Sequence, residues 1–158
     1  MRYFVLVFAM CCLFWLPAAA QVPVSPVGQS IEGTWISQLA DSAGNVSLFE
    51  VGNFSSDGSY TGANVNGLQS THKGVWQRTG HLKFVSTVIF FTHDAQGAFN
   101  GIVKARIYVK LAEDLQSYDS IAERIVMDKF GNVLSATPGI AGHAVRMNVE
   151  IPQYLPPQ

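Results

Sequence analysis

Residues 31–39 read IEGTWISQL, and this short stretch sets the pattern for the rest of the chain. Its residues alternate in the way that is typical of a β-strand with one face in apolar surroundings. A segment that contains two prolines, QVPVSPVGQS (residues 21–30), comes directly before it and is expected to be an extended leader. The stretch therefore predicts the first strand of a domain, with Trp35 as a large, rigid residue of its core.

The clearest alternation lies further along, in residues 98–111. Phe99, Val103 and Ile107 share one parity, whereas Lys104 and Arg106 lie on the other. A strand with this pattern buries one face and exposes the other to water. The segment is therefore expected to lie in the wall of an antiparallel sheet.

Apolar and β-branched runs recur along the chain, separated by turn signals such as Asp57-Gly58. The predicted strands cover residues 33–40, 46–55, 58–65, 71–78, 81–93, 98–111, 117–128 and 143–151. Evenly spaced strands joined by hairpins favour an all-β fold, a single eight-stranded, mostly up-and-down antiparallel β-barrel. We expect this barrel domain to span residues 31–151, with an extended tail at residues 152–158, and a β-sandwich is the alternative.

The first 20 residues predict a secretory signal peptide. Arg2 precedes a continuous apolar run over residues 3–16, and Ala18 to Ala20 supply small residues for cleavage before Gln21. The alternative is a membrane anchor, but the run is shorter than the roughly 20 residues that span a bilayer. We therefore expect a secreted or periplasmic protein with no stable membrane insertion after cleavage. Both cysteines, Cys11 and Cys12, would leave with the signal.

Charge and spacing argue against several function classes. The chain has 10 basic and 11 acidic residues and no basic stretch, so no nucleic-acid partner is expected. No nucleophile elbow or phosphate-binding loop appears, and no catalytic residue, metal or cofactor is assigned. The histidines lack metal-ligand spacing and are expected to be solvated residues near turns: His72, His81, His93 and His143. Asn45 and Asn53 stand in glycosylation sequons, which matter only in a eukaryotic source.

The tripeptide GTW at residues 33–35 resembles the Gly-x-Trp signature of lipocalin and calycin barrels. In lipocalins an arginine of the last strand packs over that tryptophan, and the matching position here is Arg146. The segments GVWQRTG (74–80), DAQGAF (94–99) and DKFGNV (128–133) are similar to those of a group of small secreted lipocalin-like proteins. The resemblance spans about residues 33–149, and it implies a barrel closed by Trp35 and Arg146 without implying a reaction.

Strand parity singles out two charged residues. Glu50 shares its predicted face with Leu48 and Phe54, and Arg124 shares its face with Tyr118. If both faces point inward, the two charges should form a buried ion pair, because an unpaired charge inside a barrel is costly. The alternative is a bulge or register slip that places Arg124 outside.

The interior of an eight-stranded barrel is either filled by side chains or holds one small ligand. The leading hypothesis is an exported barrel that binds a small apolar or amphipathic molecule, with Glu50, Phe84, Tyr118 and Arg124 lining the lumen and Arg124 facing a ligand carboxylate. One alternative is a barrel enzyme of cyclase or isomerase type, in which Glu50 or Tyr118 transfers a proton. Another is a solid-core interaction or inhibitor protein. An open lumen would favour the first hypothesis and a filled lumen the last.

Overall fold

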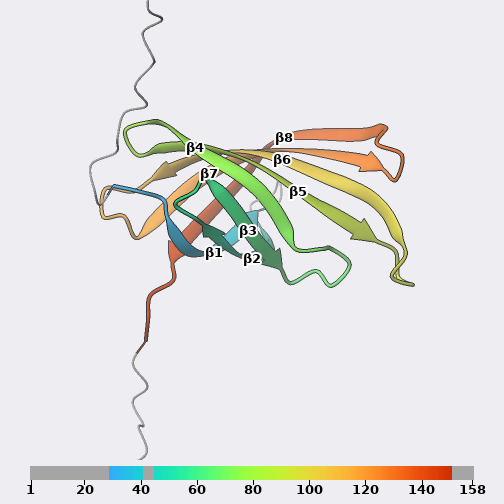
Figure 1. Ribbon diagram of the computed structural model, residues 1–158, viewed down its shortest axis with the longest axis horizontal. Coiled ribbons are helices and arrows are strands. Elements are labelled where there is room, and N and C mark those ends of the chain that lie inside the picture. The colour runs from blue at the N-terminus through green and yellow to red at the C-terminus, as the bar shows by residue number, and fades with distance from the viewer. Residues whose placement is uncertain (1–28, 41–44, 151–158) are drawn as a thin grey trace, which may run out of the picture.

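The protein forms one closed antiparallel barrel of eight strands, which confirms the predicted fold class (Figure 1). The computed structural model describes residues 29–40 and 45–150. The strands are β1 (Gly33–Ala40), β2 (Val46–Phe54), β3 (Ser59–Asn64), β4 (His72–Gly80), β5 (Lys83–His93), β6 (Phe99–Leu111), β7 (Ser117–Asp128) and β8 (Val133–Arg146). The predicted signal peptide, most of the leader and the predicted tail lie outside the described residues.

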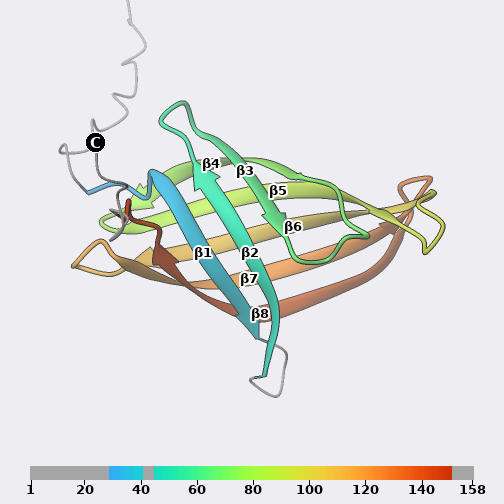
Figure 2. The same ribbon diagram turned by 90° about the horizontal axis from the view of Figure 1, so that it is seen from below.

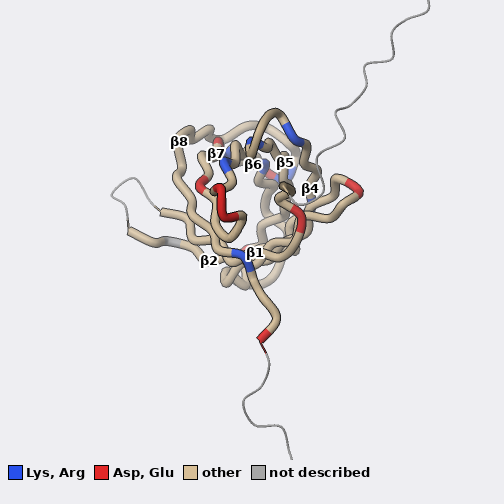
Figure 3. Tube along the Cα trace, turned by 90° about the vertical axis from the view of Figure 1, so that its left-hand side faces the viewer, with Lys and Arg blue, Asp and Glu red and all other residues tan. Residues whose placement is uncertain are grey.

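Each strand pairs with the next along the chain, and β8 pairs back with β1 to close the ring (Figure 3). The closing register runs from Trp35 opposite Arg146 to Leu39 opposite Gly142. This up-and-down order rules out the sandwich alternative. Among the described residues, no helix is long and apolar enough to cross a membrane.

Several turns between strands are built on an aspartate followed by a glycine. In the β2–β3 turn, the Asp57 carboxylate accepts a hydrogen bond from the backbone N–H of Ser59 at 2.9 Å, and Gly58 adopts a φ of 83°. The β7–β8 turn has the same design, with Asp128 accepting from two backbone N–H groups and Gly131 at a φ of 89°. Aspartate holds its own turn in this way, and glycine takes the left-handed conformation without strain.

The eighth strand starts earlier than predicted, at Val133 rather than at residue 143. The sequence ATPG (136–139) suggests a break, but its proline lies in a bulge. Ala122 pairs with Ile140 and Arg124 pairs with Thr137, so Pro138 and Gly139 together face the single residue Glu123. A bulge tolerates proline because one backbone N–H there is not needed in the ladder.

The strands differ greatly in length, and this makes the barrel asymmetric. β3 has 6 residues, whereas β6 has 13 and β8 has 14. The hairpins β5–β6 and β7–β8 extend beyond the shorter strands β1 to β4 on one side (Figure 2). The opposite end of the barrel holds the large buried side chains of the core.

Candidate functional site: a cavity in the open half of the barrel

The closed half of the barrel is built around Trp35, which is fully buried. Its indole N–H donates a hydrogen bond to the backbone carbonyl of Ile31 at 2.8 Å. The Arg146 guanidinium lies 4.3 Å from the centroid of the Trp35 ring, as the resemblance to lipocalins predicts. Phe54 and Tyr118 complete the aromatic packing, and the Trp35 and Tyr118 ring centroids are 4.9 Å apart. This end of the lumen is therefore filled.

Arg146 also ties the chain leading into β1 to the loop before β7. Its guanidinium donates hydrogen bonds to the backbone carbonyls of Ser30, Glu32 and Leu115. Gly33 makes room for it: a Cβ at Gly33 would lie 2.7 Å from the Arg146 Nη1, and Gly33 has a φ of 119°. This explains the glycine of the GTW motif, since an L-residue there would be strained and would displace the arginine.

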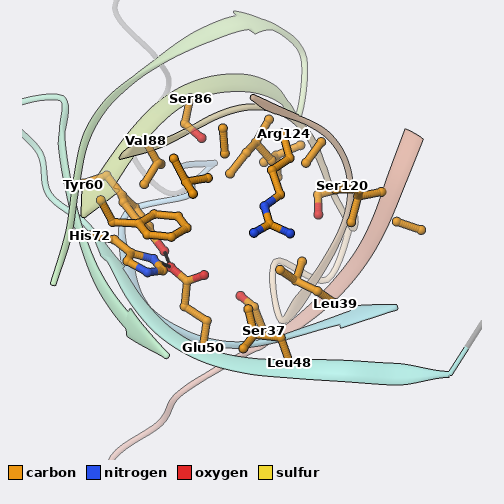
Figure 4. A pocket seen from close by; sticks show the side chains of 18 of the residues that line it. Ser37, Leu39, Leu48, Glu50, Tyr60, His72, Ser86, Val88, Ser120 and Arg124 are labelled. Carbon is orange, nitrogen blue, oxygen red and sulfur yellow. Dashed lines mark hydrogen bonds and ion pairs between the residues drawn. The ribbon is translucent and has the colours of Figure 1, made fainter. Parts of the chain in front are cut away.

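Above this plug, the other half of the lumen is an open cavity of about 760 Å³ (Figure 4). Aliphatic side chains supply much of its wall, including Leu39, Leu48, Val88 and Val103. Polar side chains occur at intervals on the same wall: Ser37, Glu50, Tyr60, Asn66, Gln69, His72, Ser86, Tyr118, Ser120, Arg124 and Thr137. Small-molecule sites combine an apolar wall with a few placed polar groups in this way.

Glu50 is the centre of the largest polar cluster. Its Oε1 accepts hydrogen bonds from the Tyr60 hydroxyl at 2.5 Å and from His72 Nδ1 at 2.9 Å. The Glu50 side chain is 13% exposed and that of His72 is 3% exposed. His72 also stacks on Phe90, with ring centroids 4.1 Å apart. Strands β2, β3, β4 and β5 thus hold one carboxylate in a single orientation.

The hydrogen bonds around Asn64 define which nitrogen of His72 carries the proton. The backbone N–H of Asn66 donates to Asn64 Oδ1, so the amide nitrogen of Asn64 is the atom 3.1 Å from His72 Nε2. An amide nitrogen only donates, so Nε2 must accept. The proton therefore lies on Nδ1, from which His72 donates to Glu50.

Two glycines make space for this cluster. A Cβ on Gly62 would lie 2.5 Å from Glu50 Oε1 and 2.7 Å from the Tyr60 hydroxyl, and one on Gly52 would overlap the Tyr60 ring. The buried Tyr60 hydroxyl next to the Glu50 carboxylate has its pKa strongly raised, first by desolvation and then by the negative charge. Tyr60 therefore stays protonated and donates to Glu50.

Tyr118 lies at the boundary between the plug and the cavity. Its hydroxyl and that of Ser37 are hydrogen-bonded at 2.9 Å. Burial raises the pKa of Tyr118 to about 12, although the Ser37 hydrogen bond acts in the opposite direction. Tyr118 is neutral at ordinary pH and contributes a hydroxyl, not a charge, to the floor of the cavity.

Arg124 lies on the inner face of β7, where its parity placed it. The regular register between β6 and β7 sets it opposite Ala105, which also lines the cavity. Its guanidinium extends into the lumen (Figure 4). Arg124 remains exposed to solvent, and it forms no hydrogen bond or ion pair with any residue in the part of the chain that the structure describes.

The predicted ion pair between Glu50 and Arg124 is wrong. Glu50 pairs with His72 instead, from the neighbouring wall, and Arg124 projects from the far side of the lumen. Parity showed that both residues point inward, but it could not show which side chains meet in a barrel wide enough to hold a cavity.

Two further expectations need correction. Phe84 does not line the cavity: it is buried in the core of the closed half, in edge contact with Trp76. His72 is a buried member of the Glu50 cluster and not a solvated residue at a turn. The signal for His72 was present in the sequence, because it shares its parity with Gly74 and Trp76. His81 and His143 are exposed, as expected.

Ser86 was not predicted as a site residue. It is buried and lines the cavity, and its Oγ has no hydrogen-bond partner within residues 29–40 and 45–150. Most buried hydroxyl groups in proteins are paired, so an unpaired one at the wall of a cavity points to a missing partner. Among residues 29–40 and 45–150, no three His, Cys, Asp or Glu side chains are arranged to hold a metal ion.

No protein-family model, curated protein or solved structure matches this chain. The geometry of the site is a filled end held by Arg146 and, above it, an open cavity. Its wall carries an ordered carboxylate, and also a hydroxyl and a guanidinium that no described residue pairs.

Proposed function

We propose that this chain is an exported, lipocalin-like barrel that binds one small apolar or amphipathic molecule in its lumen. The observation that carries the proposal is the cavity of about 760 Å³, which lies in the lumen and is lined by side chains from strands on opposite sides of the barrel. Its size falls within the roughly 300–1,000 Å³ typical of small-molecule sites. An apolar ligand would be stabilised there by the aliphatic wall residues.

The polar groups of the wall support an amphipathic ligand. In the described part of the chain, the buried Ser86 hydroxyl has no hydrogen-bond partner and the Arg124 guanidinium has no hydrogen bond or ion pair. A barrel that only needs a stable core would not bury an unpaired hydroxyl such as that of Ser86, because a buried polar group without a hydrogen bond destabilises the folded state. The open lumen also argues against the solid-core interaction protein.

Native mass spectrometry of the protein purified from its exporting host tests the proposal. The expected result is a protein of mature mass, beginning at Gln21, with a small molecule that dissociates at higher collision energy. Ala122 lines the cavity and Ile121, beside it, is exposed on the outside. Ala122→Phe should therefore release the ligand, whereas Ile121→Phe should retain it. A wild-type protein that carries no small molecule and binds no fluorescent fatty-acid probe would overturn the proposal.

The second candidate is a barrel enzyme of isomerase or cyclase type, and the Glu50 cluster is the observation that favours it. A carboxylate held by Tyr60 and His72 beside an apolar cavity is a suitable group for moving a proton. Incubation of the loaded protein in D₂O distinguishes the two. Proton abstraction would place deuterium in the recovered ligand, and Glu50→Gln would stop it. A ligand recovered without deuterium supports binding alone.

A further inference from the structure

The cavity contains one negative and one positive group that the protein does not pair with each other. Both hydrogen bonds to Glu50 end on Oε1, and no residue in the described part of the chain bonds to Oε2. Arg124 approaches from the other side of the lumen with its donors unused (Figure 4). The two groups therefore form two separate poles in one cavity.

The negative pole is held rigidly. Tyr60 and His72 lock the carboxylate, and Asn64 in turn holds His72. A carboxylate that only needed to be neutralised would gain more from contact with Arg124. Instead, the network leaves one oxygen with its acceptor positions open toward the cavity, so the group suits recognition of a hydrogen-bond donor.

We propose that the ligand has two polar ends: an acidic group that binds Arg124, and a hydrogen-bond donor, an ammonium or a hydroxyl, that binds Glu50 Oε2, with an apolar segment between them. The inference rests on the proposed lumen-binding function and names its ligand class.

A ligand with a single polar end fits this cavity less well. A simple fatty acid would satisfy Arg124, but its chain would cover Glu50 and strip water from an unpaired carboxylate. A simple amine would satisfy Glu50 and leave Arg124 covered in the same way. A ligand with both groups replaces the lost water at each pole, because each contact is a charge-assisted hydrogen bond.

The first experiment compares four probes of equal chain length on the wild-type protein by isothermal titration calorimetry. The probes are dodecanoic acid, dodecylamine, ω-hydroxydodecanoic acid and ω-aminododecanoic acid. At least one of the two-ended probes should bind about tenfold or more tightly than both one-ended probes, as expected for one added hydrogen bond to a charged group. Shorter ω-amino acids then measure the span between the poles.

The second experiment uses variants that remove one pole at a time. Arg124→Met should weaken dodecanoic acid and the two-ended probes by about tenfold or more and leave dodecylamine unchanged or tighter. Glu50→Gln should weaken dodecylamine and the ω-amino probe and leave dodecanoic acid unchanged or tighter. The controls are Arg106→Met and Glu123→Gln, because these residues pair with each other at 3.1 Å on the outer surface.

The outcomes separate this inference from the proposed function. If none of the probes binds the wild type, lumen binding itself is wrong. If dodecanoic acid binds and neither two-ended probe binds more tightly, the cavity takes a one-ended ligand and the two-pole inference is wrong. The wild-type comparison needs no variant, so it decides the question even if Glu50→Gln unfolds the barrel. Equal weakening of every probe by a Glu50→Gln variant that circular dichroism shows to be folded would also contradict the inference.

Discussion

The two halves of the lumen are built from the same strands, yet they treat polar groups in opposite ways. In the closed half, the Trp35 N–H and all three guanidinium nitrogens of Arg146 donate to backbone carbonyls. In the open half, Ser86 Oγ, the Arg124 guanidinium and one oxygen of Glu50 have no hydrogen-bond partner among the residues that the structure describes. The difference indicates a division of roles, in which one half holds the barrel together and the other half is left open for a ligand.

The two arginines of the last two strands show the difference most directly. Arg146 on β8 packs on an indole and donates to three carbonyls. Arg124 on β7 extends into the cavity. The first should affect stability and the second should affect binding, and four changes can break or sharpen this contrast.

Trp35→Ala should have the largest effect. Removal of a fully buried indole leaves a cavity in the plug and should lower the free energy of unfolding by about 3–5 kcal/mol. Urea denaturation followed by circular dichroism measures it. Phe130→Ala, at a residue that is 78% exposed in the β7–β8 turn, should change stability by less than about 0.5 kcal/mol. Equal effects of the two changes would mean that Trp35 does not plug the barrel.

Arg146→Ala should lower the free energy of unfolding by roughly 2–3 kcal/mol, through lost hydrogen bonds and the lost cation–π contact. In a double-mutant cycle with Trp35→Ala, the coupling energy should be about 1–2 kcal/mol. The matched control is Arg124→Met, which should change stability by less than about 0.5 kcal/mol because it breaks no hydrogen bond or ion pair with the described residues. A larger loss for Arg124→Met than for Arg146→Ala would reverse the contrast between the halves.

Gly62→Ala should lower the free energy of unfolding by about 1–3 kcal/mol, because its Cβ has to displace Glu50 and Tyr60. The same change should weaken binding of donor-bearing probes, since it disturbs the orientation of Glu50. Gly67→Ala is the control, because a Cβ there would meet nothing within 4 Å. A neutral Gly62→Ala variant would show that the cluster is not as tightly packed as its distances indicate.

Alkaline pH tests the burial of Tyr118 at the boundary between the halves. Its folded pKa of about 12 is above the ordinary value of 10. The contribution of the buried, protonated Tyr118 to stability is therefore fully present below pH 10. It is lost progressively as the pH rises from 10 through 12, because the unfolded state releases its proton first. At pH 11, the ionisation of Tyr118 in the unfolded state should lower the free energy of unfolding by about 1 kcal/mol.

Tyr118→Phe should make the decline in stability between pH 9 and pH 11 shallower by roughly that amount. The decline should not vanish, because burial and Glu50 raise the pKa of Tyr60 in the same direction. Tyr108→Phe is the control, since Tyr108 is 69% exposed on the outer face. The same slope in wild type and Tyr118→Phe would mean that Tyr118 ionises equally in both states.

Alternation and turn signals predicted much of the fold. The first seven strands lie close to their predicted bounds, and the inward faces of Glu50, Tyr118 and Arg124 followed from parity alone. The start of β8 could not be predicted in the same way, because Pro138 breaks a strand unless its partner strand permits a bulge. That information lies in the pairing with β7 and not in the local sequence.

The candidate site was less predictable than the fold. The partners of Glu50 come from β3 and β4, so the cluster depends on how far neighbouring strands are offset around the barrel. Space is also decisive: Tyr60 reaches Glu50 only because positions 52 and 62 are glycines. The sequence could not predict that Ser86 Oγ lacks a hydrogen-bond partner among the described residues, because this depends on which side chains the neighbouring strands place around it.

The pairing of β1 with β8 also has a consequence for how the barrel forms and opens. Every other pairing joins strands that follow one another in the chain, whereas this one unites its two distant ends. Local hairpins form with little loss of chain entropy, but closure between remote segments has to overcome most of that loss before its contacts form. Contacts that form after the rate-limiting step slow unfolding without speeding folding. We therefore expect the hydrogen bonds of Arg146, which join both ends of this seam, to slow the unfolding of the closed barrel.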